Sequence, residues 1–113
     1  MEVITSHTNA DFDALASMVA AKKLYPGAKL VFPGSQEKSM RDFFLESAFY
    51  AMEVERLRNV DVSSITRLII VDNRNPSRLG KLAEALKRPD LSVHIYDHHP
   101  TAIGDVRGEL EIV

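Results

Sequence analysis

Two hydrophobic periods alternate along the chain of 113 residues. Short apolar runs have the length of buried strands, and between them apolar residues recur about every three to four positions, as on one face of a helix. The runs that predict strands span residues 1–6, 28–32, 67–72, 91–96 and 109–113. The segments that predict helices span residues 13–25, 38–48 and 77–87. Strands that alternate with helices through short loops predict an α/β fold of three layers (α/β/α), with a mostly parallel, twisted, Rossmann-like sheet between helices.

Proline and two ambiguous segments decide where these elements end. The first helix should stop at Pro26, because proline cannot continue a helix. Pro76 is well placed to begin the last helix, since the first helical position does not need its N–H. Residues 50–59 fit either an edge strand or a continuation of the second helix, and residues 62–65 fit a turn or a single helical turn.

Composition indicates an ordinary globular domain. With 45% hydrophobic residues, a chain of this length can bury one core and hardly a second. The 14 basic and 16 acidic residues nearly balance, so no global field attracts nucleic acid. The absence of cysteine excludes disulfides, thiolate metal sites and thiol nucleophiles. No apolar run approaches the ~20 residues of a membrane span, and no basic region precedes the first apolar run as in a secretory signal. We therefore expect one cytoplasmic domain over residues 1–113.

Three of the predicted strands lead directly into histidine or carboxylate residues. These candidates are His7, Asp11 and Asp13 after the first strand, Asp72 at the end of the 67–72 strand, and Asp97, His98 and His99 after the 91–96 strand. The carboxyl ends of parallel strands form the ligand-binding edge of a doubly wound sheet. We therefore expect these side chains to lie close together at that edge.

Imidazole and carboxylate ligands without cysteine favour Mn²⁺, Mg²⁺ or Fe²⁺ over a structural zinc. The carboxylates would repel one another strongly unless cations lay among them. A carboxylate that bridges two cations holds them about 3.5–4 Å apart, the spacing used for in-line displacement at phosphorus by a bridging water. Asp72 is the candidate bridge, because its strand is expected between the other two ligand strands. Arg74, two residues further on, is a candidate phosphate contact.

Each segment also has a simpler explanation. Asp11 or Asp13 could only cap the first helix, which for that segment alone is about as plausible as metal binding. Asp72 could satisfy backbone donors of its own loop. A solvated loop arginine is the more common situation for Arg74. Residues 98–99 are harder to dismiss, since adjacent imidazoles gain nothing from core packing and should point in different directions, one toward metal and one toward substrate.

Three segments together resemble the first three motifs of the DHH phosphoesterase superfamily. They are residues 7–17 (HTNADFDALAS), Asp72 after an apolar strand, and residues 97–100 (DHHP). The superfamily includes RecJ-like exonucleases, nano-RNases and pAp phosphatases, family II inorganic pyrophosphatases and exopolyphosphatases. The resemblance covers essentially the whole chain and implies a hydrolase with two divalent cations, Mn²⁺ first and Mg²⁺ second, acting on a phosphorylated small molecule or a short single-stranded nucleic acid.

The resemblance also implies a role for each candidate residue. The implied metal ligands are His7 and Asp11 for the first cation, Asp13 and His98 for the second, and Asp72 as the bridge. Asp97 would orient its neighbours, His99 would contact the scissile phosphate, and Asn9 would have a supporting role. We therefore predict His99, Asp97 and Asp13 as catalytic residues, and His99 and Arg74 as substrate-binding residues.

The family pattern extends beyond residue 113. Members carry a fourth metal-binding aspartate and usually a smaller C-terminal domain that closes over the substrate. We therefore expect this chain to be the N-terminal part of a DHH domain in a longer multidomain protein, with weak or no activity alone. The tail over residues 104–113 resembles that of bacterial DHH domains fused to CBS domains and a tRNA nucleotidyltransferase-like region. Asp105 in that tail is expected to be a turn residue rather than a replacement ligand.

Two functions from other classes stay open beside the enzyme. One is a module that binds a nucleotide or phosphate without hydrolysing it, and the other is a structural metal-binding domain of a larger RNA-processing protein. The enzyme is favoured, since a non-catalytic site does not need His99 beside His98. Among substrates, the sequence leaves open single-stranded DNA, short oligoribonucleotides, pAp, cyclic dinucleotides, pyrophosphate and polyphosphate.

Overall fold

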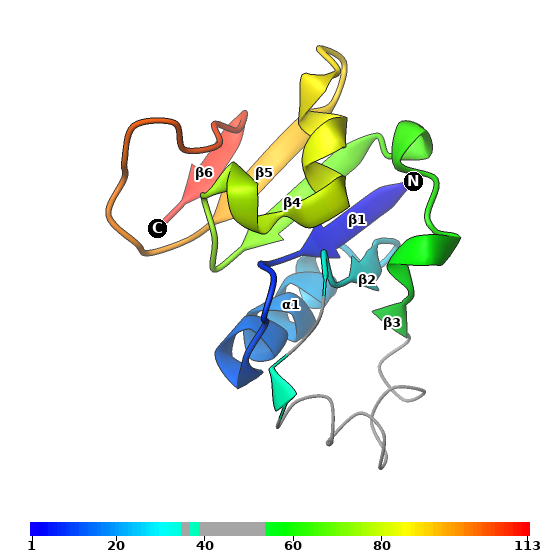
Figure 1. Ribbon diagram of the computed structural model, residues 1–113, viewed down its shortest axis with the longest axis horizontal. Helices are drawn as coiled ribbons and strands as arrows, with labels where there is room; N and C mark the ends of the chain where they lie inside the picture. Colours follow the sequence, from blue (N-terminus) through cyan, green and yellow to red (C-terminus); the bar gives the residue numbers. More distant parts are fainter. Residues whose placement is uncertain (35–36, 39–53) are drawn as a thin grey trace.

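A six-stranded sheet with helices on both faces forms the frame of the computed structural model, which describes residues 1–34, 37–38 and 54–113 (Figure 1). The strands are β1 (Glu2–Thr5), β2 (Lys29–Val31), β3 (Val54–Glu55), β4 (Arg67–Val71), β5 (Ser92–Tyr96) and β6 (Leu110–Ile112). Their order is β3-β2-β1-β4-β5-β6, and every neighbouring pair is parallel. The predicted α/β class is confirmed.

Helices of two kinds surround this sheet. The α-helix α1 spans Phe12–Leu24. The 3₁₀ helices are η2 (Leu57–Asn59), η3 (Val62–Ser64), η4 (Pro76–Arg78) and η5 (Gly80–Lys87). None of the helices in the described ranges is long and apolar enough to cross a lipid bilayer.

Both faces of the central strands are buried, which accounts for their almost purely apolar sequence. Successive side chains of a strand point to opposite faces, so β4 contributes Ile69 to one core and its neighbours Leu68 and Ile70 to the other. The first core lies under α1, and the second lies under η5, which buries Leu82. The three layers expected from the sequence are therefore present (Figure 1).

The C-terminal end of α1 is joined to β5 by hydrogen bonds between side chains. The Oη of Tyr25 lies 2.6 Å from Nδ1 of His94 and 2.7 Å from Oη of Tyr96. Burial, and then the hydrogen bond with Tyr96, raise the pKa of the Tyr25 phenol above its usual range, so the hydroxyl stays neutral and can donate. These contacts hold α1 against β5, the strand that leads into residues 97–99.

Most of the predicted boundaries agree with the structure within one or two residues. Within residues 50–59, the described part forms the edge strand β3 followed by η2, so the edge-strand alternative is confirmed there. Of the two alternatives for residues 62–65, the single helical turn is confirmed, as η3. The helix predicted over residues 38–48 falls outside the described residues, apart from Lys38.

The single helix predicted over residues 77–87 is wrong. The segment consists of two 3₁₀ helices, η4 and η5, which meet at Leu79. Gly80, the first residue of η5, has a φ of +54°, which a residue inside an ordinary α-helix does not adopt. The carbonyl oxygen of Pro33 lies only 2.3 Å from where a Cβ of Gly80 would be. A backbone approach between distant segments therefore sets the geometry of this layer.

Replacing Gly80 with alanine should lower the free energy of unfolding by about 2–4 kcal/mol, because the new Cβ adds left-handed backbone strain to a clash with Pro33. Urea denaturation measures this effect. The matched control is Gly27→Ala, since Gly27 has no atom within 4 Å of its would-be Cβ and no positive φ. Similar losses of unfolding free energy for both variants would contradict the explanation that the approach of Pro33 to Gly80 divides this segment into two helices.

Candidate metal centre and phosphate pocket

Most of the predicted ligands lie at the switch point of the sheet, where the order of the strands changes direction. From β1 the sheet continues outward through β2 and β3 on one side, and through β4, β5 and β6 on the other. The carboxyl ends of strands on either side of such a switch point form a natural ligand crevice. His7 follows β1 and Asp72 follows β4, and Nε2 of His7 lies 3.5 Å from Oδ2 of Asp72.

A first group of possible ligands consists of His7, Asp11 and Asp72, whose donor atoms lie within 4.8 Å of one another. Asp11 is also the N-cap of α1, where its Oδ1 accepts a hydrogen bond of 2.9 Å from the backbone N–H of Ala14. The capping role considered for Asp11 is thus confirmed. Because the cap uses Oδ1, the Oδ2 atom of the same carboxylate is left for another partner.

A second group contains Asp72, Asp97, His98 and His99, again with donor atoms within 4.8 Å of one another. Asp72 belongs to both groups. Its φ of +56° is uncommon outside glycine, although aspartate and asparagine tolerate this region best. Backbone strain of this kind costs about 1–3 kcal/mol and is concentrated at functional sites. The strained turn places the carboxylate of Asp72 within both groups of possible ligands.

Asp13 is placed differently from the other candidates. It is an exposed residue in the first turn of α1 and belongs to neither donor group in the described part of the chain. Its implied roles as ligand of the second cation and as catalytic residue stay predictions.

The surroundings of Asp97 bear on whether a divalent cation suits this site. Its side chain is fully buried, with Oδ1 in contact with Nδ1 of His99 and Oδ2 3.3 Å from Nε of Arg74. The angle at Arg74 is not that of a hydrogen bond, so the buried Oδ2 atom has no donor. A buried carboxylate oxygen without a donor is costly unless positive charge lies nearby. The guanidinium of Arg74 supplies this charge to Oδ2. The fit to a metal therefore rests on the donor set, whose oxygen and nitrogen atoms suit a hard divalent cation rather than a thiolate-preferring one.

His98 and His99 do not point in different directions as expected. Their rings stack with centroids 4.7 Å apart and an angle of 23° between the planes. The chain has left the extended geometry of β5 at this point, so the alternation that separates neighbouring side chains on a strand no longer applies. Asp97 holds the ring of His99 through Nδ1, and Nε2 of this ring has no hydrogen-bond partner among the described residues.

His7 has two mutually exclusive hydrogen-bond arrangements at Nδ1. This atom lies 3.0 Å from the carbonyl oxygen of Thr8 and 2.9 Å from Nη2 of Arg78. A neutral ring that donates from Nδ1 to Thr8 leaves a lone pair on Nε2, the atom that faces Asp72. A ring that accepts from Arg78 carries its hydrogen on Nε2 instead. Only the first arrangement suits a ligand that binds a cation through Nε2.

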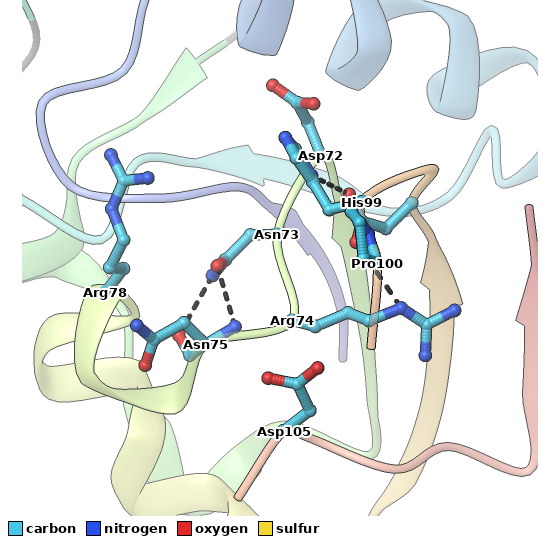
Figure 2. Close-up of a pocket in the computed structure, with 9 residues that line it drawn as sticks. Asp72, Asn73, Arg74, Asn75, Arg78, His99, Pro100 and Asp105 are labelled. Carbon is cyan, nitrogen blue, oxygen red and sulfur yellow. Dashed lines mark hydrogen bonds and ion pairs between the residues drawn. The ribbon is translucent and has the colours of Figure 1, made fainter. Parts of the chain in front are cut away.

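A pocket of about 200 Å³ opens beside the second donor group (Figure 2). Its lining is almost entirely polar and comprises Asp72, Asn73, Arg74, Asn75, Arg78, Asp97, His99, Pro100 and Asp105. Asp105 accepts a hydrogen bond of 2.7 Å from the backbone N–H of Ala102, as a turn residue does. Figure 2 shows Arg78 on one side and Asp72 and His99 on the other, with Asn73 and Asn75 between them.

Residues 2–110 match the family model described as "DHH family, N-terminal domain". The chain belongs to the DHH family. This DHH domain is 61% identical over 107 residues to an A-adding tRNA nucleotidyltransferase of Geobacter sulfurreducens. The match covers 95% of this chain but only 12% of that relative, so the chain spans a small part of the relative's length. The resemblance inferred from the three motifs is confirmed.

Arg74 of the DHH domain is buried, not the solvated loop arginine considered as the alternative. Its guanidinium contacts the carboxylates of Asp97 and Glu111, and so connects the site to β6. The hydrogen bond from Arg74 lowers the pKa of Glu111 below its usual range. Figure 2 shows the guanidinium extending away from Arg78 toward β6. A substrate contact by Arg74 stays a prediction.

Asn73 was not among the predicted residues of the DHH domain, although it follows Asp72 directly. Its Nδ2 donates to the backbone carbonyl of Ser6 at 3.2 Å, and its Oδ1 accepts from the backbone N–H of Asn75 at 2.9 Å. The hydroxyl of Ser6 donates to the carbonyl of Val71 at 2.7 Å. These bonds join the ends of β1 and β4 and so set the separation of His7 from Asp72. The two asparagines, Asn73 and Asn75, directly after an apolar strand are the sequence signal that could have identified this role.

Proposed function

We propose that this DHH domain is the metal-binding part of a phosphoesterase, with Asp72 placed between two divalent cations. The observation that carries the proposal is that Asp72 is the residue shared by the two donor groups, on a strained turn at the switch point of the sheet. His7 and Asp11 would hold one cation, and His98 would hold the second together with Asp13. Mn²⁺ is the preferred ion, and Mg²⁺ is the second choice.

Two such cations would supply Lewis acidity at a phosphoryl group and a hydrolytic water of lowered pKa. The chain's own residues would orient the substrate. His99 is half exposed, is fixed through Nδ1 by Asp97 and lines the pocket, so its other ring nitrogen would donate a hydrogen bond to a phosphoryl oxygen. The contact of Asp97 with Arg74 keeps this carboxylate in place behind the imidazole.

The test is hydrolysis of a panel of phosphoesters and phosphoanhydrides in Mn²⁺: pAp, a short oligoribonucleotide, a cyclic dinucleotide, pyrophosphate and polyphosphate. We expect product release that a chelator stops and that His99→Ala reduces by about 10²–10³-fold, the usual effect of losing one donor to a developing negative charge. His94→Ala is the matched control, since His94 lies on β5 but does not line the pocket. Equal rates for both variants would contradict the role of His99.

The named relative favours a second candidate, a metal- or phosphate-binding module of a larger RNA-processing protein. In that case the domain would bind cations and nucleotides but would not hydrolyse any member of the panel. Tight Mn²⁺ binding without turnover, in this chain and in a longer chain that contains it, would support the module over the enzyme.

A further inference from the structure

We propose that Arg78 is the side chain that binds a phosphoryl group of the substrate, and that the pocket beside it takes this group alone rather than a whole nucleotide. The proposal rests on the proposed function and names the binding residue within it. Arg78 lines the pocket together with Asn73, Asn75 and His99.

The first observation is that none of the described carboxylates compensates the charge of Arg78. Its Nη2 donates to the carbonyl oxygen of Thr8 at 3.1 Å and lies 2.9 Å from Nδ1 of His7, and neither partner is a carboxylate. Within the described ranges, no carboxylate oxygen lies within 4 Å of its guanidinium nitrogens. Arg74, by contrast, is engaged by two carboxylates. Of the two arginines that line the pocket, Arg78 is therefore the one whose guanidinium is available to an anionic ligand.

The second observation is that Arg78 is held in position while keeping donors free. The backbone N–H of Thr8 donates to the carbonyl of Arg78 at 2.8 Å, so both its backbone and its Nη2 are tied to the turn that carries His7. In the part of the chain that the structure describes, Nε and Nη1 have no hydrogen-bond partner. A planar guanidinium with free donors is the group best suited to a phosphate, which it can bind with two parallel hydrogen bonds.

The third observation concerns size and chemistry. A pocket of about 200 Å³ is smaller than the ~300–1,000 Å³ that drug-sized ligands occupy. The amide of Asn75 and the guanidinium of Arg78 supply donors to its lining, whereas Nδ2 of Asn73 already donates to the carbonyls of Ser6 and Asn75. The lining has no phenyl, phenol or indole ring on which a base could stack. The carboxylates of Asp72 and Asp97 would repel an anion until cations are bound beside them. The pocket thus suits a phosphoryl group that enters after the metal.

The test is to measure the affinity for inorganic phosphate by ³¹P NMR titration in saturating Mg²⁺. The Mg²⁺ affinity of the same samples is measured by calorimetry. We expect Arg78→Gln to weaken phosphate binding by about 10- to 100-fold, the effect of losing charge-assisted hydrogen bonds. Arg78→Lys should keep part of the affinity, since it keeps the charge without the planar fork. Lys81→Gln is the matched control, because Lys81 is an exposed cation of η5 outside the pocket.

Unchanged phosphate affinity in Arg78→Gln, or equal losses in Arg78→Gln and Lys81→Gln, would overturn the proposal. A parallel loss of Mg²⁺ affinity in Arg78→Gln would also overturn it, since Arg78 would then act through His7 and not on phosphate. Failure of the unaltered chain to bind Mg²⁺ or Mn²⁺ would instead refute the proposed function.

Discussion

Replacing Asp72 with asparagine should reduce the affinity for Mn²⁺ by at least ~100-fold. Removal of residues that only support metal ligands already costs about 10–100-fold, and Asp72 belongs to both donor groups. Asparagine tolerates the positive φ of this position almost as well as aspartate, so the turn should keep its shape. Calorimetric titration with Mn²⁺ measures the effect, and a stoichiometry near two for the unaltered chain would show that both groups bind.

The control for this experiment is Asp90→Asn. Asp90 is an exposed aspartate, 3.6 Å from Arg88 and outside both donor groups, so its loss removes the same charge without touching the site. Equal Mn²⁺ affinity for Asp72→Asn and Asp90→Asn would refute the placement of a cation at Asp72.

Replacing Arg74 with methionine should lower the free energy of unfolding by about 3–5 kcal/mol. The fully buried carboxylate of Asp97 would lose its cationic neighbour, and breaking one side of a buried pair costs about this much. Urea denaturation measures the loss, which is a large part of the ~5–15 kcal/mol that stabilises a domain. Adding Asp97→Asn to Arg74→Met should recover part of it, because the double variant no longer buries an unpaired charge.

Arg107→Met is the matched control for Arg74. Arg107 also approaches Glu111, at 4.0 Å, but its side chain is 70% exposed, and ion pairs of this kind contribute about 0–1 kcal/mol. If both substitutions destabilised the chain equally, burial could not be the reason for the importance of Arg74.

The strand ends were predictable because the pattern that identifies a buried strand also shows where it stops. Val71 is the last apolar residue of β4 and Tyr96 is the last residue of β5. An aspartate follows each of them directly. Parallel pairing then places these ends at one edge without further information. For this reason sequence reasoning anticipated the convergence of His7 on Asp72.

Two of the features that sequence reasoning missed depend on contacts between distant segments. The break at Gly80 comes from the carbonyl of Pro33, which no local pattern reveals. Arg74 is buried because Glu111, far along the chain, lies beside it. Local sequence indicates which residues could form a site, but the burial and pairing of each charge follow only from the assembled sheet.

The position of β1 between β2 and β4 also determines when the site can form during folding. Ser6 and Val71, which are hydrogen-bonded across these strand ends, lie 65 positions apart in the chain. Pairings between such distant residues form slowly, because the entropy of closing the intervening chain is lost before the contact stabilises it. His7 precedes Asp72 in the chain and is synthesised before it, yet it lacks this partner until β4 has been made and has docked. The ability to bind a cation is therefore acquired late in folding, after local helical turns have formed.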